Sequence, residues 1–238
     1  MQNTLYWKPQ CDAFQDRFTI LTYDARAQGQ SDRGRQNLSL DGHAADLAAL
    51  LEHLAIEKAF LAGVSHGAKI ALAHGVTRPD QVNGLVLCSV GASPTCRSRL
   101  FVRSWLHILD ALGMEAMVWA ALPVVLGERF LSQKKTIYES MVGAVVQRNT
   151  KEALCAHLEA VGSYPPLSQL AAHVRQPTLV ISGSEDPLVT KEGAIELAAL
   201  CHGHHVHFSG VGHSVPGEVP ALFNETLLRF VNHEQSNG

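Results

Sequence analysis

The chain has 238 residues, 46% of them hydrophobic, which is enough for one large globular domain with a sizeable core. Its 19 basic and 22 acidic residues give a net charge of −3 and form no basic run, which argues against a nucleic-acid-binding protein. The sequence contains no uninterrupted apolar run of about 18 residues and no secretory signal, so we expect a cytoplasmic protein without a membrane span.

The first part of the chain alternates strand-like and helix-like segments. The expected elements are a strand over Phe18–Tyr23, a polar loop over Asp24–Asp32, a helix over Leu40–Leu54 that Ser39 could cap, a buried strand ending near Val64, a helix from there to about Val76 before Pro79, and a buried strand over Leu85–Val90. This alternation predicts an α/β fold, with a mostly parallel sheet and helices on both faces. Such sheets carry their sites at the carboxyl ends of the strands.

The pattern becomes purely helical between residues 93 and 174. The expected helices cover Arg97–Leu112, Met114–Leu126, Ser132–Val146 and Lys151–Val161. We interpret residues 93–174 as a helical cap, inserted after the third strand of a core formed by residues 1–92 and 175–238. Most of its large apolar residues should form the cap's own core, and a few should line a pocket. The elements expected after it are a strand over Thr178–Ser182, a helix over Lys191–Leu200, a strand over His205–Phe208 and a helix over Val219–Phe230.

A sharp strand-to-helix turn is predicted at Gly63-Val64-Ser65-His66-Gly67, a Gly-x-Ser-x-Gly pattern. In a nucleophile elbow of this kind, a Cβ at Gly63 or Gly67 would collide with the neighbouring strand or helix. Ser65 would then project from the carboxyl end of its strand. The backbone N–H of His66 would begin the helix and face the negative charge that develops on an oxyanion. The alternative is a glycine-rich structural turn that contains an ordinary serine.

A serine nucleophile needs a base and a group that orients that base. Asp186 follows one of the last strands on a tight turn, and His213 lies in a glycine loop just past the other. The order Ser65, Asp186, His213 is the order that this elbow requires. Glu185 is a rival for the acid, although the residue directly before Pro187 is better placed on the turn.

Four further histidines cluster near the last strand but indicate no metal site. Alternate residues of a strand face opposite ways, and no cysteine or carboxylate completes a ligand set. We interpret these residues as surface side chains and expect neither a metal nor a cofactor; they are His202, His204, His205 and His207.

Several segments together resemble the α/β-hydrolase superfamily, and the resemblance covers nearly all of the chain. They are Tyr23-Asp24-Ala25-Arg26, the elbow, Arg78 to Leu87, Pro177 to Gly183, Asp186 and Gly210-Val211-Gly212-His213. The chain looks most like the small capped esterase, enol-lactonase and C–C hydrolase group, and it is also similar to acyl-thioester acyltransferases. This resemblance implies the fold and the triad and leaves the substrate open.

Two departures from the family pattern stand out. The family's Arg-Gly-His-Gly-x-Ser loop reads Arg26-Ala27-Gln28-Gly29-Gln30-Ser31 here. The family also carries about 25 more residues before the tryptophan that Trp7 resembles, including a central strand and the loop that gives a second oxyanion N–H. Without that strand, the Phe18–Tyr23 strand could pair directly with the Ser65 strand, another chain could fill the gap, or the natural protein could start upstream.

The sequence therefore predicts a cofactor-independent serine hydrolase that cleaves an ester, lactone or thioester through an acyl-enzyme. The expected partner is a small acyl or aromatic substrate, and an uncovered sheet edge would favour a homo-oligomer. One alternative is an acyltransferase that uses the same triad. Another is a weak or inactive ligand-binding protein of the same fold, which the missing oxyanion loop favours.

Overall fold

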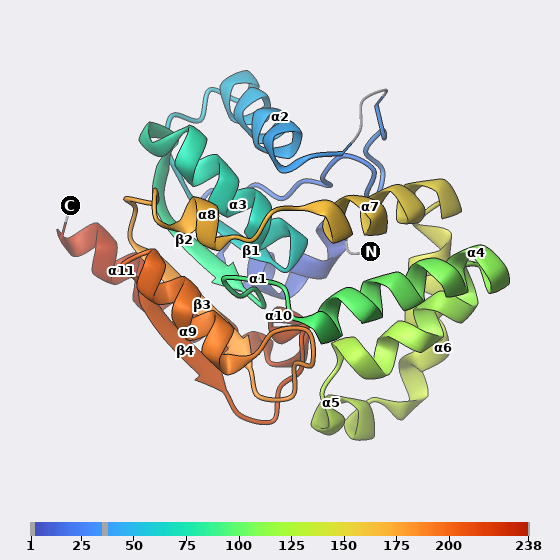
Figure 1. Ribbon diagram of the computed structural model, residues 1–238. Coiled ribbons are helices and arrows are strands. Elements are labelled where there is room, and N and C mark those ends of the chain that lie inside the picture. The colour runs from blue at the N-terminus through green and yellow to red at the C-terminus, as the bar shows by residue number, and fades with distance from the viewer. Residues whose placement is uncertain (1–2, 35–37, 238) are drawn as a thin grey trace.

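The computed structural model describes residues 3–34 and 38–237 (Figure 1). In that part of the chain, the strands form one parallel sheet in the order β1-β2-β3-β4. The strands are β1 (Ala59–Val64), β2 (Val82–Cys88), β3 (Thr178–Gly183) and β4 (His204–Phe208). The predicted α/β class with a parallel sheet is therefore confirmed.

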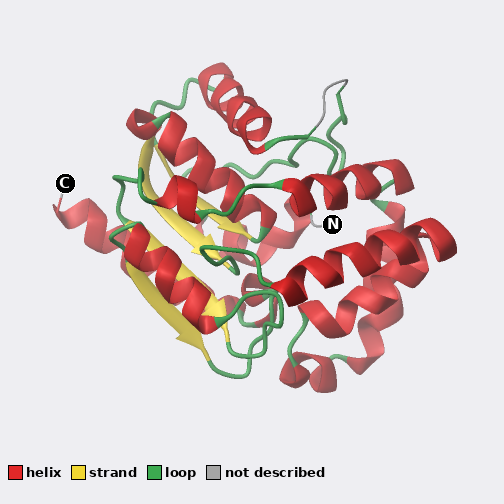
Figure 2. Cartoon of the chain, in the orientation of Figure 1, coloured by secondary structure: helices red, strands yellow, loops and turns green. Residues whose placement is uncertain are grey.

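Helices cover both faces of the sheet (Figure 2). The helices on one face are α3 (His66–Thr77) and α9 (Lys191–Leu200), with α2 (Leu40–His53) and α8 (Ser168–Ala171) outside them. The elements on the other face are α11 (Pro220–Asn237), α10 (Val215–Glu218), α1 (Lys8–Phe14) and the 3₁₀ turn η1 (Thr4–Trp7). Each face has its own apolar core, one with Leu72, Leu85 and Leu197, the other with Val86, Ile181 and Phe223.

Helix α2 shows how local chemistry sets an element boundary. Ser39 has an extended backbone, and its hydroxyl accepts the N–H of Gly42 at 3.1 Å. This bond satisfies one of the donors that have no partner within the first helical turn. The predicted cap is confirmed, and it fixes the start of the helix that packs on α3.

The insertion between β2 and β3 is helical throughout its regular structure. Its elements are α4 (Cys96–Val125), α5 (Glu128–Gln133), η3 (Lys135–Ile137), α6 (Tyr138–Gln147), α7 (Lys151–Ser163) and the short α8. Gly113 breaks α4 with φ 87° and ψ −178°, at the boundary expected between two helices. Trp105, Leu109 and Met117 are buried in a core of the insertion's own, whereas Trp119 is 39% exposed. The division into core and cap domains stays a prediction.

Helix α4 is long and apolar enough to cross a membrane by length and composition alone, with a mean hydropathy of 1.6 over an 18-residue window. Core helices of globular domains pass the same test. Here α4 packs on α6 and α7. The expectation that the chain has no membrane span stays a prediction.

The prediction of a strand over Phe18–Tyr23 is wrong. These residues have no regular secondary structure, and Ile20 and Leu21 are 38% and 39% exposed. The segment is rich in β-branched and aromatic residues, which favour strands, but a strand also needs a partner to pair with. The insertion consequently follows the second strand of the sheet, not the third as predicted.

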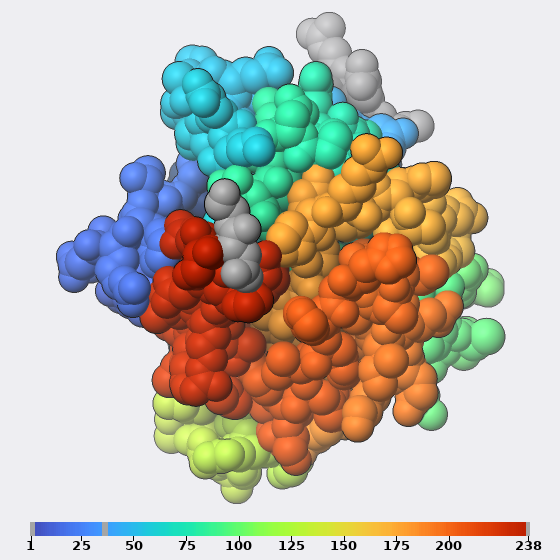
Figure 3. Space-filling model, turned by 90° about the vertical axis from the view of Figure 1, so that its left-hand side faces the viewer, coloured from blue at the N-terminus to red at the C-terminus, as the bar shows by residue number. Residues whose placement is uncertain are grey.

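The first strand, β1, lies at an open edge of the sheet. Within the described residues, β1 pairs only with β2, and Phe18–Tyr23 does not pair with it directly. Only Gly63 and Val64 of β1 are buried, so the expectation of a buried strand holds at its carboxyl end and is wrong for residues 59–62. The N-terminal helix α1 instead packs against α11, where Gln10 donates to Asn224 at 2.9 Å (Figure 3).

Candidate active site

Ser65 stands on a sharp turn between β1 and α3. Its φ of 53° and ψ of −111° lie outside the regions that a non-glycine residue prefers, a strain that typically marks functional sites. A Cβ on Gly63 would lie 2.3 Å from the carbonyl carbon of Gly67, so glycine is required at 63 as predicted. At Gly67 a Cβ would meet nothing within 4 Å, because this position of α3 faces open space. The predicted collision at Gly67 is therefore wrong.

Asp186 and His213 lie together, from loops that follow β3 and β4. His213 Nδ1 donates to Asp186 Oδ2 at 2.7 Å, and both side chains are buried. The other oxygen of Asp186 accepts the N–H groups of Leu188 at 2.8 Å and Val189 at 3.2 Å. The carboxylate is therefore held from both sides, and it fixes the tautomer in which Nε2 of the imidazole is free to act as a base.

The rival carboxylate, Glu185, has a different partner. It is exposed, and its Oε2 accepts the N–H of Glu128 at 2.6 Å. This bond ties the β3 loop to the start of α5 in the insertion. Asp186 is therefore the acid that contacts the histidine.

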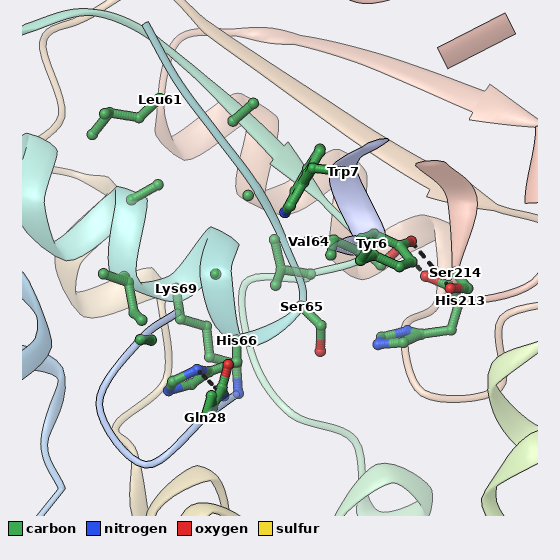
Figure 4. A pocket seen from close by; sticks show the side chains of 18 of the residues that line it. Tyr6, Trp7, Gln28, Leu61, Val64, Ser65, His66, Lys69, His213 and Ser214 are labelled. Atoms are coloured by element: carbon green, nitrogen blue, oxygen red, sulfur yellow. Dashed lines mark hydrogen bonds between the residues drawn. The ribbon is translucent and has the colours of Figure 1, made fainter. Parts of the chain in front are cut away.

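The imidazole of His213 extends toward the hydroxyl of Ser65 across a shared opening (Figure 4). In the described part of the chain, the bond to Asp186 is formed, whereas Ser65 Oγ and His213 are not hydrogen-bonded to each other. Long nucleophile-to-base contacts are common without substrate and shorten in the reactive complex. The structure thus brings the three predicted residues to one rim of the sheet.

The loop that carries His213 is anchored by residues that sequence reasoning missed. The carboxylate of Glu218 accepts the N–H groups on either side of His213, from Gly212 at 3.0 Å and Ser214 at 3.1 Å. It also accepts the N–H of Gly127 at 3.0 Å, and burial raises its pKa. Ser89 Oγ donates to the carbonyl of His213 at 2.7 Å. A carboxylate five residues after the histidine was the only sequence signal for this anchor.

His66 follows the nucleophile and is the first residue of α3, as predicted. A first-turn N–H has no acceptor inside its own helix, so it is available to an oxyanion beside Ser65. The side chain of His66 is buried next to His157, with ring centroids 4.5 Å apart. Gln28 Nε2 donates to Nδ1 of both rings at 3.1 Å, and His66 Nε2 then donates to the hydroxyl of Tyr164 at 3.2 Å. Burial lowers the pKa of both histidines well below 6.5, which keeps them neutral.

A cavity of about 1500 Å³ joins these groups. Ser65, His66 and His213 line it together with residues of the insertion, chiefly Trp105, Leu106, Val118, Leu122 and Val125. The cavity continues past Ser65 along the open edge of β1, with Phe18–Tyr23 on its far side. The predicted contribution of a few apolar cap residues to a pocket is consistent with this lining.

The histidine cluster near β4 is organised around one serine. His205 and His207 share a face of the strand, are half-buried, and contact Ser182 Oγ at 2.9 and 2.8 Å. The prediction that all four are surface residues is wrong for these two and holds for His202 and His204, which are exposed. Among the residues that the structure describes, no three His, Cys, Asp or Glu side chains are arranged to hold a metal ion.

Curated relatives of similar length cover almost the whole chain. The "Putative carbamate hydrolase RutD" of Caulobacter segnis is 25% identical over 95% of this chain and 86% of its own length. The "3-oxoadipate enol-lactonase 2" of Acinetobacter baylyi is 24% identical over 94% of this chain and 83% of its own.

Solved structures show the same fold. The enol-lactonase from Burkholderia xenovorans LB400 has a TM-score of 0.87 with 24% identity, covering 97% of this chain and 87% of that one. The α/β hydrolase MGS-M2 from a deep-sea metagenome library has a TM-score of 0.90 with 23% identity, covering 98% and 86%. The family model described as serine aminopeptidase, S33, matches residues 10–219. The chain therefore belongs to this hydrolase family of the α/β-hydrolase superfamily.

Proposed function

We propose that the protein is a serine hydrolase that cleaves a carboxylic ester, lactone or thioester through an acyl-enzyme. The observation that carries this proposal is the 2.7 Å bond between His213 and Asp186, beside a strained Ser65 in one cavity. No cofactor is needed for this chemistry, because the three side chains supply the nucleophile, the base and its orienting acid. We expect the reaction to take place in the cytoplasm.

In the proposed reaction, His213 Nε2 takes the proton of Ser65 as Oγ attacks the substrate carbonyl. Asp186 stabilises the imidazolium that forms. The tetrahedral oxyanion is stabilised by the N–H of His66, and its collapse expels the alcohol or thiol, which takes the proton from His213. Water then attacks the acyl-enzyme with His213 again as base, which releases the acid and restores Ser65.

The names of the relatives agree with carbonyl chemistry of this class. The names "Putative carbamate hydrolase RutD" and "3-oxoadipate enol-lactonase 2" both describe hydrolysis at an acyl carbonyl, of a carbamate in the first and of a lactone in the second. The mostly apolar wall that the insertion gives the cavity favours an acyl or aromatic substrate. If another acceptor displaces water from the acyl-enzyme, the same residues give an acyltransferase.

A fluorophosphonate probe tests the nucleophile directly. We expect a covalent adduct on Ser65, located by mass spectrometry, and its loss in Ser65→Ala. Turnover of p-nitrophenyl esters should be lost in the same variant. Folded wild-type protein without an adduct and without turnover would refute the proposal.

A second candidate is a ligand-binding protein without turnover. The open edge of β1, along which the cavity extends away from Ser65, favours it. A thermal-shift screen with acyl esters and lactones, run beside the esterase assay, separates the two. Stabilisation by a ligand that is recovered intact would favour the binder.

A further inference from the structure

Lys69 is a cation in the active-site cavity that the proposed mechanism does not use. It lies on α3, four residues after Ser65, and lines the same cavity. Figure 4 shows its side chain extending from α3 beside His66, toward Gln28. The residue is half-buried, and desolvation lowers the pKa of its ammonium to about 8.

No acid compensates this charge. Within residues 3–34 and 38–237, the ammonium of Lys69 makes no ion pair and no hydrogen bond to protein, and its Nζ lies over the ring of Tyr164, 5.8 Å from the centroid. The ionisable groups that interact with Lys69 are His66, His157 and the ring of Tyr164, and none of them is an acid that is ionised near neutral pH. Among the described residues, the acids that line the cavity, Glu57 and Glu159, form no ion pair with Lys69, and Asp46, which interacts with His43, is engaged by Arg26. An enclosed cation without a counter-charge is costly unless a ligand supplies one.

A second donor lies beside it. The ring of Tyr164 stacks on His66 with centroids 5.8 Å apart. Because His66 Nε2 donates to the hydroxyl of Tyr164, the proton of that hydroxyl remains available to another acceptor. Burial raises the pKa of Tyr164 to about 12, so the hydroxyl keeps its proton near neutral pH. Tyr164 also lines the cavity, and its ring centroid lies 5.8 Å from the ammonium of Lys69.

We propose that Lys69 and Tyr164 form a subsite for a carboxylate on the acyl portion of the substrate. The subsite rests on the proposed serine hydrolase activity and narrows its substrates to half-esters, or lactones and thioesters of the same kind, with a free carboxylate. A helix rises about 1.5 Å per residue, so Lys69 is roughly 6 Å along the axis from Ser65. A short carbon chain between the carboxylate and the scissile carbonyl spans that distance. One ammonium and one hydroxyl suit a single negative charge.

Two matched substrates test the subsite. The anionic one is mono-p-nitrophenyl glutarate, and the neutral one is its methyl ester at the remote carboxyl. We expect the wild type to favour the anion in kcat/KM by about tenfold or more, and Lys69→Met to reduce the ratio of the two values by about 10- to 100-fold. Lys69→Arg should retain most of the preference. Lys135→Met, which removes an exposed lysine outside the cavity, should leave the ratio unchanged. A preference that is absent in the wild type or unchanged in Lys69→Met would overturn the subsite.

A binding experiment separates this proposal from the proposed activity. Monomethyl glutarate should bind the Ser65→Ala protein in calorimetry, and dimethyl glutarate should bind at least about tenfold more weakly. Adding Lys69→Met should remove that difference. If the difference persists in the double variant, or never appears, the subsite is wrong even where Ser65 reacts with the probe. If the difference in affinity appears and is lost in the double variant, but the fluorophosphonate probe does not label Ser65 in the wild type, the subsite stands and the hydrolase proposal falls.

Discussion

Replacing Lys69 by methionine should stabilise the free protein. Burial lowers the pKa of Lys69 from 10.5 to about 8. One pKa unit corresponds to about 1.4 kcal/mol, so holding this charge in the fold costs up to roughly 3 kcal/mol at pH 7. Because the side chain is half-buried and faces the cavity, solvent screening reduces the expected gain to about 1–2 kcal/mol. Methionine has a similar volume and leaves the packing of α3 largely unchanged.

The stability that Lys69→Met gains over the wild type should decrease as the pH rises. The folded-state pKa lies below the unfolded one, so between pH 8 and 10.5 the unfolded chain binds more protons and the stability of the wild type rises with pH. The advantage of Lys69→Met should be complete below pH 8 and should disappear toward pH 10.5. The pKa values of His43, His66 and His157 are lowered, so these neighbours stay neutral in that window. Tyr164, with a pKa of 10.0 in the unfolded chain and about 12 in the fold, begins to ionise there only when unfolded, and its contribution is common to the wild type and Lys69→Met and cancels in their difference.

Urea unfolding at several values between pH 7 and pH 10.5 measures both effects. Lys135→Met is the matched control, and its exposed side chain should give a change near zero at every pH. A Lys69→Met protein that is no more stable than the wild type at pH 7 would refute the cost assigned to the buried ammonium. A gain that does not vary with pH would show that packing, not charge, is its source.

Three further predictions concern the elbow and the acid. Asp186→Asn should lower kcat on a p-nitrophenyl ester by about 10⁴-fold, because the reactive tautomer of His213 is no longer fixed. Glu185→Gln should change kcat less than about threefold, and equal losses in the two variants would contradict the assignment of Asp186 as the catalytic acid. Gly63→Ala should lower the free energy of unfolding by more than about 3 kcal/mol, whereas Gly67→Ala should change it by under about 1 kcal/mol, as urea titration will measure. In the same assay, Ser65→Gly should be about 1–2 kcal/mol more stable than Ser65→Ala, because glycine adopts a positive φ without strain. Equal stabilities of the two variants would contradict a strained backbone at residue 65.

The elbow and the three candidate catalytic residues could be predicted because each lies directly beyond a strand. A parallel sheet brings the carboxyl ends of its strands together, so residues 65, 186 and 213 needed only correct strand ends to meet at one rim. The 2.7 Å contact between Asp186 and His213 agrees with that expectation. The error at Gly67 came from a pattern that treats both glycines alike, although only Gly63 faces backbone.

The polar, hydrogen-bonded side chains of the cavity beside Ser65 could not be predicted in the same way. Gln28, His66, His157 and Tyr164 come from a loop, the elbow and the insertion, and no sequence spacing relates them. Lys69 did leave a signal, as the only cation in the alanine-rich run after the elbow. A charged residue on a helix is usually solvated, so burial against a cavity became visible only in the structure.

The open edge of β1 shows why local composition does not decide pairing. Residues Phe18–Tyr23 have the composition of a strand, and moving toward β1 would satisfy backbone groups on both segments. The loop that follows them is fixed elsewhere, because Asp24 accepts the N–H groups of Thr4 and Gln30, at 2.7 and 3.0 Å, and Arg26 pairs with Asp46 on α2. Such a shift would also withdraw Gln28 from the two imidazoles beside the nucleophile. Those contacts hold the segment on the far side of the cavity, so the gap at the sheet edge and the space in front of Ser65 are one continuous volume.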